Sequence, residues 1–133
     1  MTFLLDTDTC IFVMKGDIVA QRELRALRPE DVALSVVTEA ELRTGARKSR
    51  SPGRTQRLLE LFLRPLAVLD FTSSDAEHYA SVRASLEKRG TPIGALDTLI
   101  AAHAVSRGLV LVTNNVREFR CVPGLRTESW ARP

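Results

Sequence analysis

The sequence predicts a single domain of the α/β class, with a mostly parallel central sheet flanked by helices. Short apolar runs typical of buried strands alternate along the chain with longer segments of helical periodicity. Alternation of this kind is typical of parallel sheets covered by helices. The length of 133 residues fits one domain, residues 1–133, and neither a repeat nor a linker divides it.

The expected strands are short and apolar, and the first of them ends at an acid, Asp6. They are expected at Phe3–Leu5, Val32–Ser35, 66–69 and 109–113, with a final short strand near 125–127.

The expected helices end where glycine or proline interrupts the apolar periodicity. Two of them are expected to begin with capping boxes, Thr38 with Glu41 and Ser74 with Glu77. The expected helices span 9–15, 17–28, 38–48, 54–63, 74–89 and 95–106.

Composition excludes several classes of protein. Hydrophobic residues make up 44% and charged residues 26%, as in soluble globular domains, and no apolar run approaches the ~20 residues of a membrane span. The first residues, MTFLLDTDTC, do not resemble an export signal, so a cytoplasmic location is expected. Cys10 and Cys121 lack zinc-ligand spacing and are expected to be small buried residues rather than a disulfide.

Positive charge is concentrated in one stretch, although the formal net charge is only +3. This stretch could bind phosphates or an acidic protein partner, or it could be a solvated helical face. Its basic residues are Arg43, Arg47, Lys48, Arg50, Arg54, Arg57 and Arg64, against one acid, Glu60.

Several acids are expected to meet at one edge of the sheet. Ligands of open α/β sheets bind outside the carboxyl ends of the strands. Asp6 follows one strand, and Glu41 and Asp97 lie early in helices that follow strands or turns. Carboxylates crowded together repel each other unless a cation joins them, and Mg²⁺ prefers oxygen ligands. Such a site would hydrolyse a phosphodiester with a metal-activated water.

Each of these residues also has a purely structural interpretation. Asp6 could begin a turn, Glu41 could only complete a capping box, and Asp97 could only complement a helix dipole. Thr113, at a strand end, could orient a carboxylate or a water. His103 lies six residues after Asp97, on another helical face, and is expected to be packed or hydrogen-bonded.

The sequence resembles the ordered motifs of VapC toxins, which are PIN-domain ribonucleases. Nearly the whole chain carries the resemblance, in the segments LLDTDTCI, LSVVTEAELRTGARKS, GTPIGALDTLIAAHA and GLVLVTNNVREFRCVPGLRTESW. It implies a PIN fold and a Mg²⁺-dependent endoribonuclease, with Mn²⁺ as a substitute. It also implies the toxin half of a toxin–antitoxin pair, with a transfer RNA cut in its anticodon loop as the expected substrate.

The resemblance also implies roles for individual residues. Asp6, Glu41 and Asp97 fall on the first three acidic positions of the family, and Thr113 falls on its hydroxyl position. The fourth position, usually Asp, is Asn115 here, so Glu118 three residues later could replace it. Asp8 is expected to support the ligands.

The antitoxin is expected to cover the same groove as the RNA. Reversing the charge of Arg47 and Arg50 should then weaken RNA binding. An apolar helical face at Leu58, Leu59 and Phe62 permits a homodimer.

Two other functions remain open on the sequence alone. FLLDTDT has the strand-then-DxD arrangement of haloacid dehalogenase-type phosphatases, with Asp6 as nucleophile and Asp8 as acid and base. The chain could also be a non-catalytic binding module, because Asn115 weakens the metal site.

Overall fold

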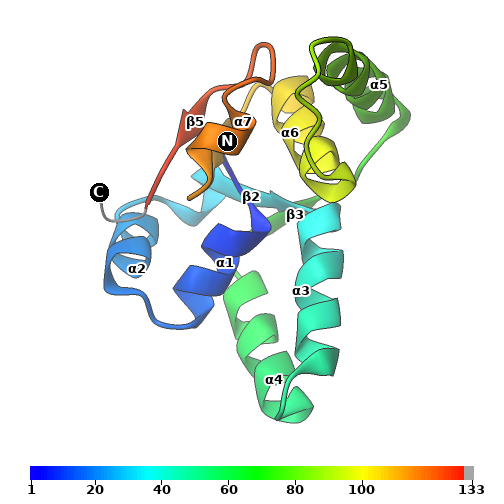
Figure 1. Cartoon of the computed structure of the whole chain (residues 1–133). Helices are drawn as coiled ribbons and strands as arrows, with labels where there is room; N and C mark the ends of the chain where they lie inside the picture. Colours follow the sequence, from blue (N-terminus) through cyan, green and yellow to red (C-terminus); the bar gives the residue numbers. More distant parts are fainter. Residues whose placement is uncertain (131–133) are drawn as a thin grey trace.

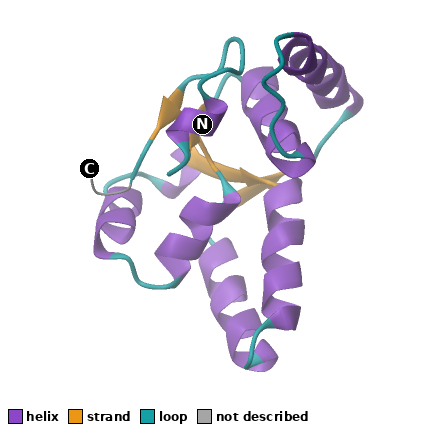
Figure 2. Ribbon diagram, in the orientation of Figure 1, coloured by secondary structure: helices purple, strands orange, loops and turns teal. Residues whose placement is uncertain are grey.

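A five-stranded parallel sheet lies between two layers of helices in the computed structural model, which describes residues 1–130 (Figure 1, Figure 2). The strand order is β3-β2-β1-β4-β5, and every pairing is parallel. The predicted fold class is therefore confirmed. The strands are β1 (Phe3–Leu5), β2 (Val32–Ser35), β3 (Ala67–Leu69), β4 (Val110–Val112) and β5 (Thr127–Glu128).

The helices divide between the two faces of the sheet (Figure 1). One face is covered by α1 (Thr7–Met14), α2 (Ile18–Arg25), α3 (Val36–Lys48) and α4 (Pro52–Leu63). The other is covered by α5 (Ser73–Lys88), α6 (Ala95–Arg107) and the short α7 (Val116–Phe119). A 3-10 turn, η1 (Pro29–Asp31), leads into β2.

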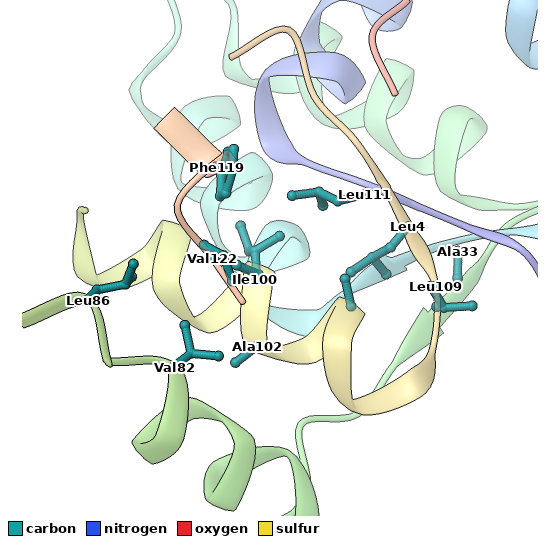
Figure 3. Close-up of a cluster of buried hydrophobic side chains, with 12 residues drawn as sticks. Leu4, Ala33, Val82, Leu86, Ile100, Ala102, Leu109, Leu111, Phe119 and Val122 are labelled. Atoms are coloured by element: carbon teal, nitrogen blue, oxygen red, sulfur yellow. The ribbon is translucent and has the colours of Figure 1, made fainter. Parts of the chain in front are cut away.

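Alternate side chains of each strand build two separate cores. Leu4 packs toward α5 and α6, whereas its neighbour Leu5 packs toward α3 and α4, since successive strand residues point to opposite faces. The first of these cores is drawn in Figure 3, where Leu4 lies near Ala33 and Leu109, and Val82 of α5 lies beside Ala102 of α6. Burial on both faces explains why the strands are continuous apolar runs.

Two predicted capping boxes are wrong. Helix α3 begins at Val36, because the Ser35 hydroxyl caps it by accepting a hydrogen bond of 3.0 Å from the Val37 backbone N–H. Glu41 therefore lies beyond the first turn and does not pair with the backbone of Thr38. Helix α5 is capped by Thr72, whose backbone N–H donates to the carboxylate of Asp75 at 2.7 Å.

The remaining differences are small and local. Helix α1 begins at Thr7 with Asp6 as its cap, two residues before the predicted start. Helix α7 was not expected, because four residues are too few for a periodic pattern. Strand β5 lies slightly later than predicted, at Thr127–Glu128.

Both cysteines are free thiols, Cys10 fully buried and Cys121 partly buried against the first core. This agrees with the expected packing role. No helix within residues 1–130 is long and apolar enough to cross a membrane.

Candidate functional site

The candidate site lies at the carboxyl end of the central strands, where α1, α3, α6 and α7 surround the edge of the sheet (Figure 1). Asp6 follows β1 directly and Thr113 follows β4 directly. The two strands are neighbours, with Leu5 opposite Val112, so Asp6 and Thr113 come side by side. Asp97 lies in the first turn of α6.

Asp6 is a buried carboxylate that already has neutral hydrogen-bond donors. It is only 4% exposed, and its Oδ1 accepts a hydrogen bond of 2.8 Å from the Thr9 backbone N–H. The Thr113 side chain also hydrogen-bonds to it. Burial raises the pKa of Asp6 above its ordinary value, an effect that these hydrogen bonds partly offset and that the charge of Asp8 increases.

Asp97 and Glu118 form a pair of carboxyl groups. Burial raises the pKa of Asp97 to about 6, helped by the charge of Glu118, a hydrogen bond between the two carboxyls and the charge of Asp8. The Asn115 side-chain amide donates a hydrogen bond to Oε2 of Glu118. Asn115 is itself placed by its backbone N–H, which donates to Thr113 Oγ1 at 3.0 Å.

Glu41 is connected to the site through Thr7 rather than through another acid. The Thr7 hydroxyl donates to Glu41 Oε1 at 2.7 Å, and Thr7 directly follows Asp6. The side chains of Thr7 and Thr38 are 3.3 Å apart. Thr7 was not identified from the sequence, although its place between two acids in DTD was a signal that could have indicated it.

The donors fit a hard divalent cation such as Mg²⁺ or Mn²⁺ better than a metal that prefers nitrogen or sulfur ligands. They are carboxylate and hydroxyl oxygens, which Mg²⁺ prefers. The pKa of Asp97 is raised by burial and by neighbouring negative charge, and a cation would offset both effects. Within residues 1–130, no three His, Cys, Asp or Glu side chains lie together in a group that could hold a metal ion, so Asp6, Glu41 and Asp97 do not form a ready-made set of three ligands. Mg²⁺ is commonly bound by only one or two carboxylates together with waters, so an open arrangement suits it.

The basic stretch forms the far end of the α3–α4 hairpin, which projects away from the sheet (Figure 1). Arg43 is neutralised by Glu39 and Glu60, each at 2.8 Å. The other six basic side chains of the stretch are exposed and make no ion pair within the described residues; they are Arg47, Lys48, Arg50, Arg54, Arg57 and Arg64. With a rise of about 1.5 Å per residue, the end of α3 at Lys48 lies roughly 18 Å from its start. The positive charge thus lies farther from the acids than the sequence suggested.

The predicted apolar face of α4 is mostly internal. Leu59 is fully buried and Phe62 packs against the second core, whereas Leu58 is 44% exposed. Another apolar surface lies beside Glu41, between the amino-terminal parts of α3 and α6. This groove is lined by Val36, Val37, Ala40, Glu41, Thr44, Leu96 and Leu99.

The chain matches a known protein family and several of its members. The model of the PIN domain family matches residues 3–125. The chain is 45% identical to the tRNA(fMet)-specific endonuclease VapC of Salmonella typhimurium, across 98% of each protein. It is 41% identical to Ribonuclease VapC2 of Haemophilus influenzae, again across 98% of each.

Solved structures agree with the sequence comparison. DNA-bound VapBC from Salmonella typhimurium matches with a TM-score of 0.94 and 45% identity, covering 98% of this chain and 99% of that chain. VapBC2 from Rickettsia felis, bound to a DNA fragment from its promoter, matches with a TM-score of 0.93 and 34% identity, covering 98% and 100%. The chain therefore belongs to the PIN-domain family and, within it, to the VapC ribonucleases.

Proposed function

We propose that this chain is the toxin of a VapBC-type toxin–antitoxin pair and cleaves a transfer RNA in a Mg²⁺-dependent reaction. The observation that carries the site assignment is the gathering of Asp97, Glu118 and Asp8, where burial together with the neighbouring acids raises the pKa of Asp97 to about 6. The substrate follows from two relatives, 45% and 44% identical, that are named tRNA(fMet)-specific endonucleases. We expect the cut to lie in the anticodon loop and the protein to act in the cytoplasm.

The side chains divide into those that would bind the cation and those that would orient them. Asp6 and Asp97 would be the principal ligands, with Glu41 nearby. Neutral donors hold the acids in place: Thr113 for Asp6, and Thr7 for Glu41. A bound Mg²⁺ polarises a phosphoryl oxygen and lowers the pKa of a bound water, which then hydrolyses the phosphodiester; Mn²⁺ would serve as a substitute.

The partners are proposed on the same basis. The matching solved structures from Salmonella typhimurium and Rickettsia felis are VapBC complexes, which supports an antitoxin partner for this chain. A homodimer is also expected, because apolar side chains remain exposed at Leu58, Leu61 and Leu96.

The phosphatase alternative is less well supported than the nuclease. Membership of the PIN-domain family, whose model matches residues 3–125, favours the nuclease over the phosphatase. The non-catalytic alternative is decided by the cleavage experiment below.

Replacing Asp6 by Asn should reduce cleavage of tRNA(fMet) at least about 100-fold, because changes to groups that merely support a metal ligand already cost ~10- to 100-fold. The amide oxygen of Asn can still cap α1, so the fold should persist. Asp17→Asn is the matched control, since Asp17 caps α2 in the same way through Ala20 N–H. Gel analysis of RNA fragments with Mg²⁺ or with chelator measures the effect. Full activity of Asp6→Asn, or metal-independent cleavage, would contradict the proposal.

Asp97 should link metal binding and stability to pH. Its folded pKa of about 6 exceeds the unfolded value of ~3.9, so ionisation lowers stability as pH rises between these values. Asp97→Asn should therefore stabilise the metal-free protein at pH 8, by ~1 kcal/mol after allowing for solvent screening, but not at pH 3. Thermal unfolding with chelator at both pH values tests this. If Asp97→Asn and the wild-type protein were equally stable at pH 8, ionisation of Asp97 would not destabilise the fold.

Glu118 rather than Asn115 should act at the fourth position. Glu118→Gln removes a charge beside Asp97, whereas Asn115→Ala removes only the amide that orients Glu118. Glu118→Gln should therefore weaken Mg²⁺ binding more, as measured by calorimetric titration. A larger effect of Asn115→Ala would reverse the assignment, and negligible effects of both would mean that waters complete the coordination.

Reversing Arg47 and Arg50 to Glu should weaken RNA binding and flatten its salt dependence. Each lost contact with single-stranded RNA should lower the slope of log affinity against log salt by roughly 0.7. Mg²⁺ affinity should change little, because neither side chain is near the acids. The same double reversal at Arg22 and Arg25, exposed on α2, is the charge-matched control. An unchanged slope at Arg47 and Arg50 would show that the hairpin end is only a solvated face.

A further inference from the structure

A buried histidine joins the helix that carries Asp97 to the helix that carries Glu41. His103 lies on α6 and is 0% exposed, with its Nδ1 2.8 Å from Ser35 Oγ. Ser35 caps α3, because its Oγ accepts the 3.0 Å hydrogen bond from Val37 N–H. One hydroxyl group therefore contacts both helices.

The direction of these hydrogen bonds follows from their partners. The carboxylate of Asp75 faces His103 Nε2 at 3.5 Å, and its negative charge favours the tautomer that carries the ring proton on Nε2. Nδ1 is then an acceptor, and the Ser35 hydroxyl, which already accepts from Val37 N–H, donates its proton to it. Burial lowers the pKa of His103, so the ring is neutral, as this arrangement requires.

Asp75 is a fixed charged anchor behind the histidine. Arg107 donates to both of its oxygens at 3.0 Å, and Ser106 donates at 2.7 Å. Arg107 above all holds the pKa of Asp75 well below its usual range. Asp75 therefore stays ionised and presents a fixed negative charge to His103 Nε2.

The three groups follow the order of a Ser-His-Asp hydrolase triad, but they cannot act as one. Ser35, His103 and Asp75 are each 0% exposed, so no substrate reaches the hydroxyl. The Ser35 oxygen is also occupied by Val37 N–H. The chain of contacts can act only by holding structural elements in place.

Near the acids, α3 and α6 leave an open groove between them. Their amino-terminal parts line this groove, which has a volume of about 580 Å³, and Leu96 is 48% exposed there. His103 lies six residues after Asp97, about 9 Å along α6. The His103–Ser35 hydrogen bond thus joins the two helices beside this groove, next to its lining residue Val36.

We propose that His103 is a positioning residue, which holds the Asp97 end of α6 at a fixed distance from the Glu41 end of α3 through Ser35. The inference rests on the proposed function, because it assumes that these acids bind the catalytic cation. His103 touches neither RNA nor cation. It acts by keeping the spacing between Asp97 and Glu41 fixed before the RNA or the cation binds.

The test compares three variants of the full chain. His103→Phe keeps a ring against Phe71, which packs edge-on at 5.1 Å, but removes the link to Ser35. His103→Asn replaces the ring with an amide that reaches about as far as Nδ1. Val82→Ala is the matched control, because it opens the same α5–α6 core without touching the link.

Mn²⁺ affinity is measured by calorimetry without RNA, with kcat and KM for tRNA(fMet) and melting temperature measured alongside. His103→Phe should raise the Mn²⁺ Kd about 10-fold and lower kcat, with KM nearly unchanged. His103→Asn should recover most of both losses. Val82→Ala should lower the melting temperature but leave the Kd unchanged.

A purely structural His103 would give a different pattern, in which His103→Phe lowers the melting temperature and leaves Kd and kcat at wild-type values. That result, or an equal change of Kd in Val82→Ala, would overturn the inference. If His103→Phe does not fold, Ser35→Ala removes the other half of the link and carries the same expectation. A wild-type chain that does not cleave RNA would instead overturn the proposed function.

Discussion

Because all five strands are parallel, their carboxyl ends reach the same edge of the sheet, and the helices that follow bring their acids to that edge. Helix amino termini carry partial positive charge, which favours acids such as Asp6 and Asp97 at these positions. This attraction does not balance their burial, since both pKa values are still raised. The sheet thus creates a concentration of negative charge that only a cation can fully relieve.

Two buried aspartates show how the protein separates a ligand from a structural anchor. Asp75 is bound by the guanidinium of Arg107, which neutralises its charge and lowers its pKa. Asp6 is bound by hydroxyl and backbone donors, which orient the carboxylate without neutralising it. A cation can compete for Asp6 but not for Asp75, because only Asp6 lacks a permanent positive partner.

The sheet and the main helices could be predicted because apolar runs and their glycine and proline boundaries are local signals. The start of α3 could not, because Val36 and Val37 are β-branched and read as a continuation of β2. Nor could the contact of Glu118 with Asp97, which depends on the four-residue helix α7. Arg43 seemed free in the sequence, but its partner Glu60 comes from the next helix.

The position of Cys10 has a practical consequence. Its thiol is completely buried on α1, and burial together with the nearby charge of Asp6 raises its pKa well above the ordinary value. Thiolates, not thiols, react with alkylating agents, so Cys10 is inert while α1 stays on the sheet. Alkylation of Cys10 then requires a transient departure of α1, and its rate reports how often the helix that carries the Asp6 cap opens. The alkylation rate of Cys10 is thus a built-in measure of local opening at the site.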